Sequence, residues 1–156
     1  STVSSMFDPK TLTIARDTID AARFAQHTRF EDEVSRVEND FPSRGASHSG
    51  ARVRAVADVC ATEIETRAIG VWANLHRALV ATGVRSSPEL ASELKTVFND
   101  LFMTYCCEEP ERKFNAVRES LGGVAIAVRA ATGFEGRVYG ARRRIEAEID
   151  LFVRSL

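Results

Sequence analysis

The sequence predicts an all-α protein, a bundle of four or five amphipathic helices in which the first two are long and form an antiparallel hairpin. Apolar residues recur at steps of three and four along most of the chain, the spacing that places side chains on one helical face. No segment alternates apolar and polar residues as a half-buried strand does. With 156 residues, 44% hydrophobic and 28% charged, the chain is long enough for one continuous core. We expect a single domain over residues 1–156, with residues 1–7 frayed.

The first helix is expected to begin at Asp8-Pro9 and to end near Phe41-Pro42. Asp8 can cap the free backbone N–H groups, and proline fits the first helical position. At the other end, Pro42 pushes Phe41 out of the helical region.

The second helix, between Ser47 and Gly83, carries the strongest periodic signal and the single tryptophan, Trp72. Ser47 and Ser49 are suited to capping its start, and Gly83 can take the left-handed conformation that stops a helix. At about 1.5 Å per residue this helix is roughly 50 Å long. The short connection between two long amphipathic helices predicts the hairpin.

A third helix is expected from Ser87 as cap and Pro88 as first residue. Its broad apolar face runs over residues 90–105, and residues 107–110 (Cys-Glu-Glu-Pro) interrupt it. A third helix of only about 30 Å would leave apolar length on the first two helices unmatched. The sequence therefore predicts a homodimer that covers this surface.

From Glu111 to Leu156 the apolar period stays nearly in one phase, although it passes Gly133, Gly136 and Gly140. Either one kinked helix or two helices fit this pattern. We favour a break near residues 132–136, because each interior glycine costs about 1 kcal/mol relative to alanine.

Charge and composition exclude several classes of function. A formal net charge of -1 gives no overall attraction to nucleic acid or to anionic membranes. No apolar run approaches the roughly 20 residues that span a bilayer, so no membrane association is expected. Three cysteines, two of them adjacent, suit a reducing compartment, and we expect a cytoplasmic protein.

The sequence predicts no metal site and no cofactor. His27, His48 and His76 are isolated from one another, and there is no Glu-x-x-His or Cys-x-x-Cys pair. Cys106 and Cys107 are neighbours, so on a helix they point about 100° apart and suit one ion poorly. A glycine-rich phosphate loop is also missing from the sequence.

The first candidate site is a gap in the apolar face of the first helix. Between Ile19 and Phe30 the inward positions hold Arg23, Gln26 and His27, which are all polar. A core-facing stretch of polar side chains needs partners on a neighbouring helix.

A hairpin turn near residue 44 sets Arg23 and His27 opposite Glu63 and Glu65. Glu63 and Arg67 also form an i, i+4 pair in the favoured order. The sequence thus predicts a polar core layer of Arg23, His27, Glu63 and Arg67. Two interpretations stay open: an ion-pair layer that fixes the hairpin register, or a small polar pocket in which His27 titrates near neutral pH.

The second candidate is an anion-binding site in the loop before the second helix. Arg44, Ser47, His48 and Arg52 lie there among small hydroxyl and glycine residues. Helix N-termini attract anions, so phosphate or a nucleotide could bind. Capping of the helix explains the same serines and glycines without a ligand.

A third feature, Arg142-Arg143-Arg144 with Arg137 nearby, is typical of a solvated helix face because acidic residues follow it. Nucleic acid stays a possible partner if these arginines lie beside Arg44 and Arg52 in the folded protein.

We expect a non-enzymatic interaction or oligomerisation module that acts through an apolar helix face, with a second copy or another protein as its partner. The alternative is a phosphate-, nucleotide- or RNA-binding protein, including a hydrolase or ribonuclease, that uses the loop before the second helix.

Overall fold

Four long helical rods build the bundle in the computed structural model, which describes residues 8–41, 50–120 and 125–156. They are α1 (Pro9–Glu38), α2 (Gly50–Thr82), a third rod and α5 (Ala125–Ser155). The third rod is α3 (Leu90–Leu101), the π-helical η2 (Phe102–Cys107) and α4 (Glu108–Glu119), joined without a break. No strand segment occurs in these residues. The all-α prediction is confirmed.

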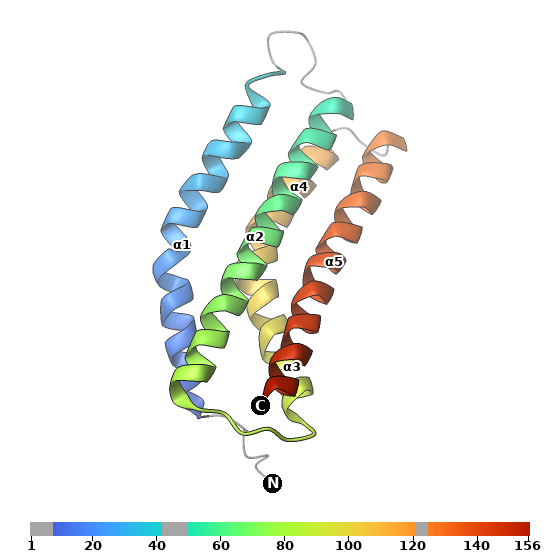
Figure 1. Ribbon diagram of the computed structural model, residues 1–156. Coiled ribbons are helices and arrows are strands. Elements are labelled where there is room, and N and C mark those ends of the chain that lie inside the picture. The colour runs from blue at the N-terminus through green and yellow to red at the C-terminus, as the bar shows by residue number, and fades with distance from the viewer. Residues whose placement is uncertain (1–7, 42–49, 121–124) are drawn as a thin grey trace.

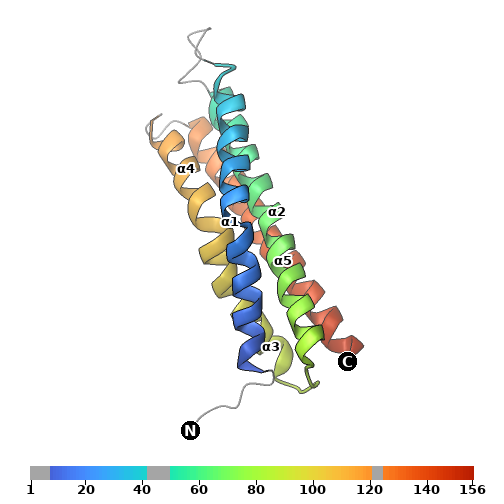
Figure 2. The same ribbon diagram turned by 90° about the vertical axis from the view of Figure 1, so that its left-hand side faces the viewer.

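The helix α2 lies at the centre of the bundle and packs against all three other rods. Figure 1 shows α1 and α5 on opposite sides of α2, with the third rod behind it. Figure 2 shows the third rod and α2 on either side of α1. The helices α1 and α2 run antiparallel, and hydrogen bonds near the two ends of the pair hold their register: Thr11 with Thr82 at 2.6 Å and Arg52 with Glu38 at 2.7 Å. The predicted hairpin therefore fits the structure.

Two of the predicted helix ends are confirmed. The Asp8 carboxylate accepts a hydrogen bond from the backbone N–H of Lys10 at 2.9 Å, and Pro9 is the first residue of α1. Gly83 has a φ of 78°, the left-handed conformation expected where α2 stops. Ser87 differs from the prediction: its carbonyl, not its hydroxyl, accepts from Leu90 N–H, and α3 begins at Leu90. The capping serines expected before α2 lie outside the described residues.

The predicted interruption at residues 107–110 is wrong, because the third rod continues through it. The rod continues although Pro110 has no N–H to donate, because the π-helical turn that ends just before Glu108 already departs from the regular α-helical hydrogen-bond pattern. With segments of 12, 6 and 12 residues, the third rod has as many residues as α1, which has 30. The length mismatch that led us to expect a homodimer is therefore absent.

The favoured break near residues 132–136 is also wrong, since α5 is one helix. Ala131, Phe134 and Ile145 are all buried in the core, so packing along the whole helix holds it together. This packing outweighs the cost of about 1 kcal/mol for each glycine.

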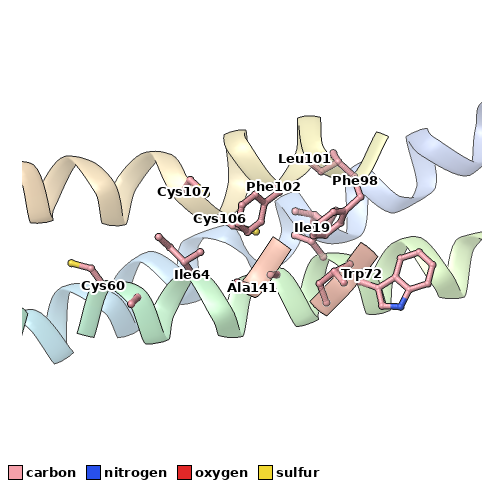
Figure 3. Close-up of a cluster of buried hydrophobic side chains, with 14 of the residues drawn as sticks. Ile19, Cys60, Ile64, Trp72, Phe98, Leu101, Phe102, Cys106, Cys107 and Ala141 are labelled. Carbon is pink, nitrogen blue, oxygen red and sulfur yellow. The ribbon is translucent and has the colours of Figure 1, made fainter. Parts of the chain in front are cut away.

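All four rods contribute to the core, and α2 contributes the most buried residues. Figure 3 shows Ile19 of α1, Ile64 of α2, Phe102 of η2 and Ala141 of α5 within one buried cluster. No helix among the described residues is both long and apolar enough to cross a membrane.

Candidate functional site

A polar cleft of about 470 Å³ opens midway along the bundle, between α1 and the η2–α4 part of the third rod. It lies beside the stretch of α1 where polar side chains replace apolar ones between Ile19 and Phe30. We call it the polar cleft. It is lined by Asp20, Arg23, Phe24, His27, Arg67, Thr104, Tyr105, Glu108, Glu109 and Arg112.

Arg67 of α2 lines the inner part of the polar cleft and is only 6% exposed. Its Nε donates to Glu63 Oε2 at 2.6 Å and its Nη2 donates to Glu109 Oε1 at 2.7 Å. Burial disfavours the charge, but the hydrogen bonds to Glu109 and Glu63 more than offset it, so the pKa of Arg67 is raised. A buried cation held by two carboxylates is fully paired, and it ties α2 to α4.

Glu109 connects Arg67 to the outer part of the polar cleft, where its second oxygen contacts His27 Nδ1. Partial burial alone would raise the pKa of Glu109. The hydrogen bonds from Arg67 and His27 outweigh burial and hold that pKa below its usual value. Glu109 is therefore an anion at neutral pH that receives donors from two other helices.

Tyr105 forms another part of the cleft wall. The Arg23 guanidinium lies over the Tyr105 ring, 5.2 Å from its centroid. Burial, followed by a hydrogen bond to Asp20, raises the pKa of the Tyr105 hydroxyl. Thr104 and Tyr105 belong to the π-helical segment η2, and such segments occur frequently at functional sites.

The predicted polar core layer is brought together in part. Glu63 and Arg67 form the expected i, i+4 ion pair, and His27 lines the same cleft as Arg67. The cross-helix partner of Glu63, however, is Arg29 at 2.7 Å, and Arg23 packs on a tyrosine instead.

Two further residues, Glu65 and Glu109, differ from the sequence prediction of this layer. Glu65 faces α5, where Arg137 donates to it at 2.6 Å. Glu109 is one of the site residues that the sequence did not reveal, because we expected residues 107–110 to interrupt the helix. No local signal in the sequence links Glu109 to His27.

A set of metal-ligating atoms lies at the edge of the polar cleft, although the sequence predicted no metal site: His27 and Glu109 line the cleft, and Glu31 lies beside them. One ligand atom each from His27, Glu31 and Glu109 lies within 4.8 Å of the other two. His27 and Glu31 are one turn apart on α1, whereas Glu109 comes from α4. The spacing along the chain could not reveal this set, because its third member belongs to a different helix.

The anion-binding prediction concerns residues that the structure describes only in part. Arg44, Ser47 and His48 lie outside the described residues, so their convergence stays a prediction. Arg52 lies on α2, where its guanidinium donates to Glu38 of α1 at 2.7 Å. Arg52 is therefore engaged in an ion pair across the hairpin, with a carboxylate that also pairs with Lys113.

The arginine-rich segment of α5 is also largely paired. Arg137 binds Asp58 at 2.6 Å and Glu65 of α2, and Arg143 binds Glu146 one turn along α5. Arg142 lies over the Tyr139 ring at 5.4 Å. These contacts fit the solvated, charge-balanced helix face that the sequence predicted as the simpler interpretation.

The three cysteines are buried and free. Burial raises the pKa of Cys60 and of Cys107 to about 12, and it raises the pKa of Cys106 even further. Thiols with such raised pKa values are neutral at physiological pH and poor nucleophiles. They fill the core.

On the other side of the third rod, between η2–α4 and α5, lies an apolar groove with hollows of about 520 and 200 Å³. Three large apolar side chains along it are more than half exposed: Met103 at 56%, Val128 at 57% and Tyr139 at 57%. Phe134 lies deeper and stacks on Phe114 of α4, with ring centroids 4.4 Å apart. Charged residues of both signs border the groove: Glu111, Arg118, Glu119, Glu135 and Arg142.

The third rod therefore separates two surfaces of different chemistry, the polar cleft facing α1 and the apolar groove facing α5. Their position on the bundle follows from helices α1 and α5 lying on opposite sides of α2. Comparison with protein-family models, with curated proteins and with solved structures finds no match to this chain.

Proposed function

We propose that this protein is a non-enzymatic helical-bundle module that self-associates through the apolar groove between η2–α4 and α5. The exposure of Met103, Val128 and Tyr139 along one groove is the observation that carries the proposal. Burial of methionine and tyrosine side chains is typical of protein interfaces, and an aligned apolar set is what an amphipathic partner helix fits.

A second copy of the chain is the partner that the charges around the groove favour. Arg118 and Arg142 border it together with Glu119 and Glu135. A two-fold dimer brings the same surface of both copies together, so a surface must be complementary to itself. A border with both signs meets this requirement, because arginines of one copy can face glutamates of the other.

The test is the molar mass in solution, measured by light scattering or sedimentation equilibrium at tens of micromolar. We expect the wild-type chain to have the mass of a dimer. The double variant Met103→Glu, Tyr139→Glu should be monomeric, because two buried carboxylates without partners would oppose association. Phe24→Glu is the matched control, since Phe24 is 81% exposed on α1, outside the groove, and this variant should remain dimeric. A monomeric wild-type chain at this concentration would contradict the proposal.

A further inference from the structure

The three metal-ligating residues at the edge of the polar cleft come from two helices, and their ligand atoms lie close together. His27 and Glu31 are four residues apart on α1, so they share a face of that helix. Glu109 approaches from α4 and touches His27. The candidate ligand atoms all lie within 4.8 Å of one another. Ligands of one zinc ion bind at about 2.0–2.2 Å from the metal, so small rotations of these side chains would bring all three into one coordination sphere.

Two of the three ligand side chains are exposed, and the third is held in place by a hydrogen bond. His27 and Glu31 are exposed, so each can change rotamer without disturbing the core. Glu109 is held from behind, because Arg67 Nη2 donates to its Oε1 at 2.7 Å and leaves Oε2 on the side of His27. Arg67 is fixed in turn by Glu63. Outer hydrogen bonds of this kind orient carboxylate ligands in metal sites.

We propose that His27, Glu31 and Glu109 bind one divalent transition-metal ion at the edge of the polar cleft. One imidazole with two carboxylates is a donor set that suits zinc and its neighbours in the first transition row. Magnesium and calcium prefer oxygen ligands alone, so the imidazole selects against them. Three protein ligands leave coordination positions on the open side of the cleft for water or for a small ligand.

The charges around the cleft allow a cation to bind. Arg23, Arg67 and Arg112 line it, and alone they would repel a divalent ion. Asp20 and Glu108 line the same cleft, and Arg67 is already paired with Glu63 and Glu109. The carboxylates of the ligand set and of the cleft wall therefore balance the guanidinium groups.

The experiment is a calorimetric titration of zinc into the purified full chain in a buffer without phosphate, with cobalt(II) as a spectroscopic probe in parallel. We expect one zinc ion per chain and a visible cobalt absorption band that changes when zinc displaces the cobalt. His27→Gln and Glu31→Gln should each weaken zinc binding at least tenfold, and both should keep the circular dichroism spectrum of the wild type, because both residues are exposed.

His76→Gln is the control variant for the same titration. His76 stacks against Trp72 at 5.5 Å and is not part of the cleft. Its loss should leave zinc affinity unchanged. The proposal is overturned if folded wild-type protein takes up no zinc at 100 µM, if His27→Gln binds zinc as tightly as wild type, or if magnesium binds equally well. Because the ligand residues lie outside the apolar groove, the result is independent of the oligomeric state.

Discussion

Arg67 is the single residue on which most of the polar cleft depends. It is buried, and it joins Glu63 of its own helix to Glu109 of α4. Its guanidinium also lies over Phe30, with the guanidinium carbon 5.6 Å from the ring centroid. Burying these charges is tolerated only because each has a partner, so the loss of one member leaves another uncompensated.

We therefore expect Arg67→Met to lower the free energy of unfolding by about 3–5 kcal/mol, since among the described residues it leaves the buried Glu63 carboxylate paired with the half-exposed Arg29 alone. Urea unfolding followed by circular dichroism measures this change. Arg143→Ala is the control, because among the described residues this exposed arginine pairs only with Glu146 one turn along its own helix, and its loss should alter stability by no more than about 0.5 kcal/mol. Equal effects of the two substitutions would contradict the importance assigned to the buried pair.

A second prediction at the scale of residues concerns the buried thiols. The pKa of Cys60 rises from 9.0 to about 12 on folding, because burial disfavours the thiolate. Below pH 9 both the folded and the unfolded chain keep this proton. Between pH 9 and about 12 only the unfolded chain loses it, so the stability that Cys60 contributes falls as the pH rises.

The measurement is reaction of the thiols with a chromogenic disulfide reagent. At pH 8 we expect no rapid reaction of the folded protein and the release of three equivalents in denaturant, since Cys60, Cys106 and Cys107 are all buried. In urea unfolding at pH 9 to 11, Cys60→Ala should show a weaker decline of stability with pH than wild type. Rapid modification of the native protein at pH 8 would show that at least one of these thiols is accessible, which would contradict the prediction.

At the scale of elements, α5 shows that packing can hold a helix that contains three interior glycines. Gly133, Gly136 and Gly140 share one face, and a Cβ built on any of them meets no atom of a neighbouring described element within 4 Å. The opposite face carries the buried residues that anchor the helix to α2 and α3. The glycines are thus tolerated within α5, and their lack of a side chain is not required by close packing against any other described residue.

Replacing each of these glycines with alanine should raise the free energy of unfolding by about 1 kcal/mol, because alanine loses less backbone entropy in a helix and meets open space. Thermal and urea unfolding of the single and triple variants test this. Gly83→Ala is the opposite control: a φ of 78° strains any residue with a Cβ, so this substitution should destabilise by about 1 kcal/mol or more. Destabilisation by all four substitutions would mean that the outer face of α5 is not open.

The third rod is the other element that positions residues of the candidate sites. Its π-helical turn lets Cys106 and Cys107 lie in the core while Thr104 and Tyr105 line the polar cleft. Glu109 follows this turn and contacts both Arg67 and His27. The irregular segment thus determines which residues of α4 face α1.

At the scale of the whole molecule, the central position of α2 creates both surfaces. With α1 and α5 on opposite sides of α2, each meets one side of the third rod. One side carries ion pairs and metal-ligating atoms, and the other carries exposed apolar side chains. Self-association through the apolar groove would leave the polar cleft accessible, so the two proposed activities are compatible in one assembly.

The sequence by itself determined the features that depend on a few neighbouring residues. The apolar period predicts the helices, Asp8-Pro9 predicts where α1 begins, Gly83 predicts where α2 stops, and the spacing of Glu63 and Arg67 predicts their ion pair. Each of these results from short-range geometry, in which the helical period, a cap or a positive φ is set within about one turn of the chain.

The tertiary structure alone decided which helices continue and which side chains meet across them. Packing energy along α5 overrides the local cost of its glycines, and the π turn carries the third rod past Pro110. The pairs Arg29 with Glu63 and His27 with Glu109 depend on the rotation and register of helices far apart in sequence. Those quantities are set by the packing of the entire core, so no local pattern encodes them.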